Sequence, residues 1–312
     1  MTNPNKSAII TTVDKNLITG ENIMKSMFAK FLTLFIVLAV FACLVVACMS
    51  PVEDNQRVKI IEVKLTDEQY AFVCKKGNTE LVESVNSFMQ KIKDDGTFDA
   101  LISKYFEGVG EKVGYSVTTT DVANTDSNLV VVTNCPFEPF EYMEADGKIY
   151  GLDIEIAAAY AQYMGLELVI KNIGFDDIFV QVEAGYADIG MAGITASPDR
   201  AEIYDFTTPY YEASQKLVVL ADNTDFDNCK TAEDVEAVLA SLVGKSIGYQ
   251  SATTGGMYIN GDDDWGYAGF DNIKGKAYAN AQIAMVDLLN GNIYAVILDE
   301  APAKAIADAI NE

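Results

Sequence analysis

The stretch Ala192-Gly193-Ile194-Thr195-Ala196-Ser197-Pro198-Asp199-Arg200 follows an apolar segment over residues 188–191 that predicts a strand. Small residues favour a turn after that strand, Thr195 supplies a hydroxyl, and Pro198 fixes φ shortly before Arg200. A guanidinium is a flat, two-pronged donor, and a hydroxyl with free backbone N–H groups can complete a cage around a carboxylate. We therefore predict an anion site here, although a surface ion pair would explain the same residues.

Arginine is rare in this chain. Lysine and arginine together number 22, yet arginine stands only at positions 57 and 200. Because the sequence uses lysine where charge alone is needed, Arg200 is interpreted as chosen for its geometry.

Composition limits the classes of function. The chain has 312 residues, of which 50% are hydrophobic and 22% charged, so it is globular and has room for two domains. A net charge of −24 argues against a nucleic-acid partner, which needs a basic surface. Histidine is absent, and histidine is the commonest general base and metal ligand. We expect a protein that is not an enzyme, with no catalytic residues, no metal and no cofactor.

The first 48 residues read as a leader with a lipoprotein signal. Lys25 and Lys30 precede an apolar run over 31–47 that contains one hydroxyl residue, Thr33, and ends in Val-Val-Ala before Cys48. Such a box predicts cleavage and lipidation at Cys48, followed by a polar tether over 49–56. The alternative is a transmembrane anchor, for which the run lies at the short limit. The expected location is extracytoplasmic, with a lipid anchor at the outer face of the cytoplasmic membrane or in the periplasm.

Three cysteines follow the signal, at positions 74, 135 and 229. Their number is odd and their spacing is not that of a metal site. A disulfide between two of them stays open at this point.

Strands and helices alternate along most of the chain. Strands are predicted at 58–63, 69–74, 129–133, 166–170, 188–192, 216–220, 245–249 and 294–298. Helices are predicted over 151–164, 281–289 and 300–310. Four further helices are predicted to begin near Thr79, Thr97, Asp176 and Thr231, and Thr97 and Asp176 are expected to cap theirs. This order implies open parallel-type sheets, in which ligands bind at the carboxyl ends of strands. Four candidate site residues follow such strands, namely Asn134, Gly193, Gln250 and Asp299.

The candidate residues suit an α-amino acid. Asp299 can accept an ammonium, and Ser251-Ala-Thr-Thr-Gly-Gly256 follows a strand and can hold an anion through N–H and hydroxyl groups. Phe137 and Phe175 can sandwich an apolar stem. Each feature has a plainer explanation, because the two phenylalanines could be core residues and Asp299 a helix cap.

Residues 128–310 resemble the polar-amino-acid substrate-binding proteins of ABC importers, solute-binding protein family 3. The resemblance lies in Val131-Val-Thr-Asn-Cys-Pro-Phe-Glu-Pro-Phe-Glu-Tyr142 and in residues 151–157, 192–200, 205–211 and 298–302. It implies the type II periplasmic-binding-protein fold, an α/β fold of two lobes joined by a hinge, and delivery of the ligand to an ABC permease.

The resemblance also implies roles for residues. Arg200 and Thr195 would bind the α-carboxylate, helped by Thr253 and Thr254, and Asp299 with the Gly193 carbonyl would bind the α-ammonium. Phe137 and Phe175 would pack on the ligand side chain, and Asn134 and Gln250 would carry selectivity. The full predicted ligand site is Asn134, Phe137, Phe175, Ala192, Gly193, Thr195, Arg200, Gln250, Thr253, Thr254 and Asp299.

The order of segments departs from the family. Residues 58–106 resemble the end of a family member, yet they precede the part that resembles its beginning. We expect a circular permutation in which residues 107–128 link the family's usual termini. Lobe 1 would then hold 70–106 plus 129–216, and lobe 2 would hold 57–69 plus 217–312. A truncated tandem protein is the alternative.

The ligand is expected to be a free L-amino acid. Asn134, Gln250 and Leu298 carry no charge, which favours a neutral polar or sulfur-containing side chain, although Glu138 lies close by and weakens that inference. Two other functions remain open: an amino-acid sensory module without a transporter, and an enzyme resembling prephenate or arogenate dehydratases.

Overall fold

The computed structural model describes residues 57–120 and 122–312. The predicted leader over 1–48, lipidation at Cys48 and the tether over 49–56 lie outside these residues. Within them, no helix has the length and apolar character needed to cross a membrane. Cys74, Cys135 and Cys229 are free thiols.

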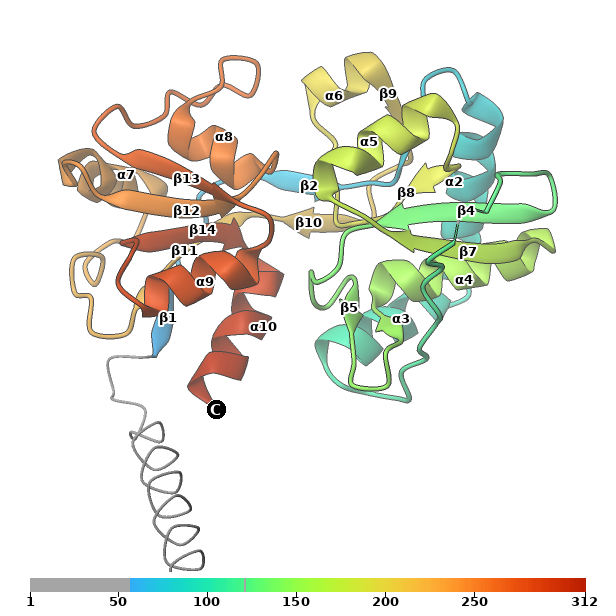
Figure 1. Cartoon of the computed structure of the whole chain (residues 1–312), viewed down its shortest axis with the longest axis horizontal. Coiled ribbons are helices and arrows are strands. Elements are labelled where there is room, and N and C mark those ends of the chain that lie inside the picture. The colour runs from blue at the N-terminus through green and yellow to red at the C-terminus, as the bar shows by residue number, and fades with distance from the viewer. Residues whose placement is uncertain (1–56, 121) are drawn as a thin grey trace, which may run out of the picture. The chain divides into compact units, whose positions relative to one another are not determined.

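The described chain forms two lobes, each built on a five-stranded sheet (Figure 1). Lobe 1 has the strand order β7-β4-β8-β3-β9 and a small β5-β6 hairpin. Its strands are β3 (Val73–Lys75), β4 (Asn128–Thr133), β5 (Tyr142–Met143), β6 (Ile149–Tyr150), β7 (Glu167–Asn172), β8 (Ile189–Gly190) and β9 (Tyr204–Phe206). Its helices are α2 (Thr79–Asp94), α3 (Thr97–Phe106), α4 (Leu152–Met164), α5 (Phe175–Ala184) and α6 (Pro198–Ile203).

Lobe 2 has the strand order β1-β11-β14-β12-β13. Its strands are β1 (Val58–Ile61), β11 (Gln215–Leu220), β12 (Ser246–Gln250), β13 (Lys274–Tyr278) and β14 (Ala295–Asp299). Its helices are α7 (Ala232–Ser241), α8 (Thr254–Asn260), α9 (Ala281–Leu289) and α10 (Glu300–Asn311). The fold is therefore the predicted α/β fold of two lobes.

Two strands run between the lobes as a hinge. They are β2 (Glu68–Tyr70) and β10 (Tyr211–Ala213), which pair antiparallel with Tyr70 opposite Tyr211 (Figure 1). The segment 69–74, predicted as one strand, is thus divided into a hinge strand and β3 of lobe 1.

Both sheets are mixed, with antiparallel pairs in what were expected to be open parallel-type sheets. In lobe 1, β4 pairs parallel with β7 and β8, whereas β3 runs antiparallel to both of its neighbours. In lobe 2, β11 is the strand antiparallel to its neighbours β1 and β14. These two exceptions, β3 and β11, are the strands that follow the hinge strands. The chain enters them directly from the other lobe, without the crossover helix that a parallel connection requires.

Strand β4 of lobe 1 is buried on both faces. Leu129 and Val131 of β4 pack in a cluster with Leu152 and Ile156 of α4. Val130 and Val132 point to the opposite face, where they pack with Ile178 of α5. This alternation explains why β4 reads as a continuous apolar run.

The segment 107–128, predicted as a linker without regular structure, contacts lobe 1 at residues 113–118. Tyr115 exchanges two backbone hydrogen bonds of 2.9 Å with Ile149, and the Thr118 N–H donates to the Ile170 carbonyl over 2.8 Å. Glu155 accepts from the Val113 N–H and forms a 2.7 Å ion pair with Lys104. The linker is therefore held on the lobe by its backbone, which sequence periodicity does not show.

Two predicted caps are wrong. Helix α3 is preceded by Gly96 in a left-handed conformation, and α5 by Gly174, so Thr97 and Asp176 are helical residues. The helix predicted from Thr231 is confirmed as α7, and Thr231 is its N-cap, because the side chains of Thr231 and Asp234 each accept a hydrogen bond from the other's backbone.

Candidate functional site

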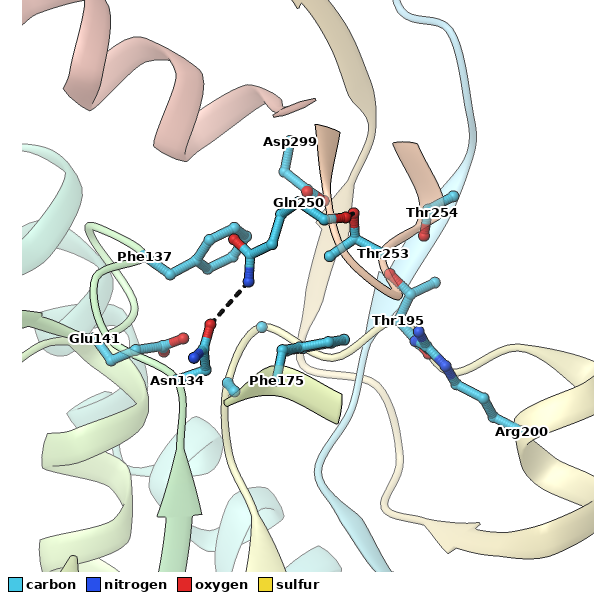
Figure 2. A pocket seen from close by; sticks show the side chains of 12 residues that line it. Asn134, Phe137, Glu141, Phe175, Thr195, Arg200, Gln250, Thr253, Thr254 and Asp299 are labelled. Carbon is cyan, nitrogen blue, oxygen red and sulfur yellow. Dashed lines mark hydrogen bonds between the residues drawn. The ribbon is translucent and has the colours of Figure 1, made fainter. Parts of the chain in front are cut away.

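One pocket, bordered by both lobes, gathers all eleven residues predicted for the ligand site (Figure 2). It is lined by Asn134, Phe137, Glu141, Phe175, Ala192, Gly193, Thr195, Arg200, Gln250, Thr253, Thr254 and Asp299. Glu141 is the one lining residue that the sequence did not predict. Whether these side chains bind a ligand stays a prediction.

Strand ends bring these residues together. Asn134 follows β4 and Ala192 follows β8 in lobe 1, while Gln250 and Asp299 are the last residues of β12 and β14 in lobe 2. This is the placement expected for ligand residues in α/β sheets. Asp299 also occupies the N-cap position of α10, but its side chain makes no capping hydrogen bond.

Arg200 is buried beside the pocket with its guanidinium fixed on two sides. It donates from Nη1 to the Thr195 carbonyl and from Nη2 to the Ala252 carbonyl, each over 2.9 Å. Three rings surround the guanidinium, with its carbon 5.7 Å from the Phe175 centroid, 5.0 Å from Phe179 and 5.3 Å from Trp265. Burial lowers the pKa of Arg200 to about 10, so it remains a cation at neutral pH. Because Arg200 is buried, the surface ion pair considered in the sequence analysis is excluded.

The turn after β8 depends on glycine. Gly193 has φ of +53°, and a Cβ there would lie 2.6 Å from a carbon of the Phe137 ring. The Gly193 N–H donates over 3.0 Å to Asp153 of α4, which also accepts from the Tyr210 hydroxyl over 2.6 Å. The close approach of Phe137 and the buried Asp153 thus set the backbone of the turn.

Asp299 is a buried carboxyl at the hinge side of the pocket. It accepts a 2.5 Å hydrogen bond from the hydroxyl of Tyr70 in β2. Burial, and then the charge of Glu68, raise the pKa of Asp299 to about 7. An approaching ammonium would favour the ionised form of this group.

Glu68 of hinge strand β2 is a second buried carboxylate that the sequence did not predict. Its Oε2 accepts from the hydroxyls of Thr195 at 2.6 Å and Thr254 at 2.8 Å. Its Oε1 accepts from Thr66 at 2.6 Å and from the Gln215 amide at 3.1 Å. Glu68 therefore joins a residue of lobe 1, a residue of lobe 2 and the hinge.

The two lobes also touch directly across the pocket. The Gln250 amide donates to Asn134 Oδ1 over 2.8 Å, as Figure 2 shows, and Arg200 donates to the Ala252 carbonyl. These two hydrogen bonds hold the cleft closed in this structure. Ala252 itself has a left-handed φ of 56°, a strained conformation for a residue with a side chain.

A model of the bacterial extracellular solute-binding proteins, family 3, matches this chain over residues 2–108 and 129–306. The ABC transporter arginine-binding protein 1 of Escherichia coli is 29% identical over 65% of this chain and 70% of its own length. A probable histidine-binding protein of Neisseria gonorrhoeae is 26% identical over 57% of this chain and 61% of its own length, less than two thirds.

Solved structures show the same similarity. A Gly52Ala mutant of arginine-bound ArgBP from T. maritima has a TM-score of 0.51 and 30% identity, covering 59% of this chain and 78% of that one. An ancestral arginine-binding protein bound to glutamine has a TM-score of 0.51 and 30% identity, covering 60% and 75%. These similarities and the two lobes identify the type II periplasmic-binding fold.

Proposed function

The chain belongs to the bacterial extracellular solute-binding proteins, family 3, and from that premise we propose that its pocket captures a free L-α-amino acid. One observation carries the proposal. A buried cation, Arg200, and a buried carboxyl, Asp299, line the same closed pocket. They match the α-carboxylate and the α-ammonium of an amino acid, and charge-assisted bonds of about 1.5–3 kcal/mol each permit tight binding.

Hydrogen bonds within the pocket bear on how the predicted ligand contacts would be made. Two N–H groups of the Arg200 guanidinium bond to carbonyls, which leaves three of its five donors for a carboxylate. Thr195 and Thr254 already donate their hydroxyl protons to Glu68, so we infer that they serve the carboxylate through backbone N–H groups. Asp299 and the Gly193 carbonyl would take the ammonium, and Phe137 and Phe175 the side chain.

We propose that the captured amino acid is delivered to an ABC permease by a protein anchored through a lipid on Cys48. The matched relatives are substrate-binding proteins, which favours this role over the enzyme and sensor alternatives. Cys48→Ala should abolish incorporation of radiolabelled palmitate into the chain, whereas Cys229→Ala, a control outside the signal, should leave the labelling unchanged. Labelling that persists in the Cys48 variant would contradict a lipid anchor at that residue.

We also propose that the chain is a circular permutation with the lobe boundaries predicted above. The amide of Asn311, at the end of α10, bonds to both the N–H and the carbonyl of Val58, at the start of β1, over 3.1 and 2.9 Å. The segments that the family would join are thus in contact. The family model also matches in two stretches separated by the linker. Both lobes are supplied by one chain, which favours permutation over a truncated tandem.

Calorimetry with a panel of L-amino acids tests the binding function. At least one should bind with micromolar or lower Kd, and Arg200→Ala and Asp299→Asn should each weaken it by about tenfold or more. Asp308→Asn, on the exposed part of α10, is the matched control and should change nothing. Unchanged binding in both site variants would show that the ligand sits elsewhere.

A further inference from the structure

The pocket has an unmatched end. Neither carboxylate oxygen of Glu141 has a hydrogen-bond partner among the described residues, and the same holds for Oε1 of Gln250. Glu141 is fully buried and Gln250 is 4% exposed. Figure 2 shows Glu141 beside Asn134 at the end of the pocket away from Arg200. Three buried acceptor atoms therefore lack a donor where a ligand side chain would reach.

The orientation of the two amides is fixed by their neighbours. Asn134 donates from Nδ2 to the Ile173 carbonyl over 2.6 Å, so its Oδ1 must face the cleft. That oxygen accepts from Gln250 Nε2, which leaves Gln250 Oε1 as the free end of the amide. Rotating the Gln250 amide would oppose two oxygens, so this end of the pocket offers acceptors.

An unpaired, buried carboxylate is costly. Burial, and then the charge of Asp153, raise the pKa of Glu141 well above its usual value. Tyr210 and Cys135 also lie within electrostatic range of Glu141, and neither supplies a positive charge. Burial thus disfavours the ionised form of Glu141, and a cation entering the pocket would favour that form.

The charges of the residues that line the pocket also favour a cationic ligand. The ionisable residues that line the pocket are Arg200, Asp299 and Glu141, one cation and two acids. A zwitterionic amino acid adds no net charge, so it offers Glu141 no positive partner. An amino acid with a cationic side chain balances all three groups.

We propose that Glu141 and Gln250 Oε1 form a subsite for a cationic ligand side chain, a guanidinium or an ammonium. These groups carry several donors and no acceptor, which fits the three unmatched oxygens. Phe137 lines the pocket beside them and offers an aromatic surface to the cation. The inference rests on the proposed amino-acid binding. It reverses the expectation of a neutral ligand, which was based on Asn134, Gln250 and Leu298 and did not include Glu141.

Calorimetry on the purified full chain tests the subsite with matched ligands. L-Arginine and L-lysine are compared with L-citrulline, which replaces the guanidinium by a neutral ureido group, and with L-glutamine. The better cationic ligand should bind at least about tenfold more tightly than either neutral one. Glu141→Gln should remove most of that preference, whereas Glu138→Gln, at an exposed position in the same loop, should keep it.

The outcomes separate the two proposals. Citrulline or glutamine binding as tightly as the cationic ligands would overturn the subsite and leave amino-acid binding intact. If no amino acid binds at all, the proposed function itself fails. The comparison of ligands on the unaltered chain needs no variant, so it decides the matter even if Glu141→Gln does not fold.

Discussion

The hydroxyl of Thr195 donates a 2.6 Å hydrogen bond to Glu68, and it thereby ties the turn before Arg200 to the hinge. Glu68 accepts four side-chain hydrogen bonds in all, and it is 4% exposed. A hinge residue thus determines which groups of the binding turn remain available to a ligand.

Glu68→Gln should destabilise the protein by about 1–3 kcal/mol, because one oxygen that accepts is replaced by a nitrogen that donates, leaving buried hydroxyls unmatched. Urea denaturation measures the loss. Glu62→Gln is the control, since its carboxylate is 80% exposed and should contribute little. Equal stability of the two variants would show that the Glu68 bonds contribute nothing net.

Gly193→Ala should lower both stability and ligand affinity. Two costs add: the positive φ, worth about 1–2 kcal/mol for an L-residue, and the clash with the Phe137 ring. Gly147→Ala is the matched control, because Gly147 has φ of +75° and a Cβ added there would have no atom within 4 Å. The difference between the variants in urea denaturation isolates the clash. Identical losses would mean that Phe137 moves aside without cost.

Stability of the ligand-free protein should fall as pH rises from about 4.5 to 7. Burial raises the pKa values of Asp299 and Asp153 to about 7, and that of Glu141 is also raised. Below pH 7 the folded state holds protons that the unfolded state has lost, so each group contributes a slope of up to about 1.4 kcal/mol per pH unit.

Asp299→Asn checks this assignment. The variant should lower the slope of stability against pH by about one group's contribution, as measured by urea denaturation at several pH values. The facing groups Tyr70, Glu68 and Gln215 remain in place in that variant. Asp308→Asn should leave the slope unchanged. A slope that Asp299→Asn does not alter would assign the effect to Asp153 and Glu141 alone.

A rearranged chain tests the proposed permutation. Residues 129–312 followed directly by 57–106 would restore the family's order under that proposal and omit the linker. Because Asn311 already contacts Val58, the new junction closes with little rearrangement, and the product should fold and bind the same ligand. Circular dichroism and calorimetry would show this. An unfolded product would indicate that the linker's bonds to Ile149 and Ile170 are required.

The rule that ligand residues follow strands predicted Asn134, Gly193, Gln250 and Asp299, which do lie together. Glu68 escaped prediction because it comes from a hinge strand and its partners are far away in sequence. Glu141 lay within the loop already singled out at 131–142, but sequence did not separate it from Glu138, three residues earlier and exposed. Burial of one acid and exposure of the other depend on the tertiary fold.

The fold, like the site, was predictable from the sequence only in part. Hydrophobic periodicity gave α9 its bounds to the residue, because both ends carry clear signals. It could not give the antiparallel direction of β3 and β11, which depends on how the chain crosses the hinge, nor the backbone bonds that hold residues 107–128.

The path of residues 107–128 has a topological consequence. This segment connects α3 to β4 within lobe 1, so lobe 1 is formed by one continuous stretch of chain. The chain enters the lobe at Tyr70 and leaves it at Tyr210, and the Tyr210 N–H donates a 2.9 Å hydrogen bond to the Tyr70 carbonyl. One lobe is thus nested inside the other, as an inserted domain sits inside its host. Two cuts at neighbouring points would release it whole, so its folding can be studied apart from the lobe that encloses it in sequence.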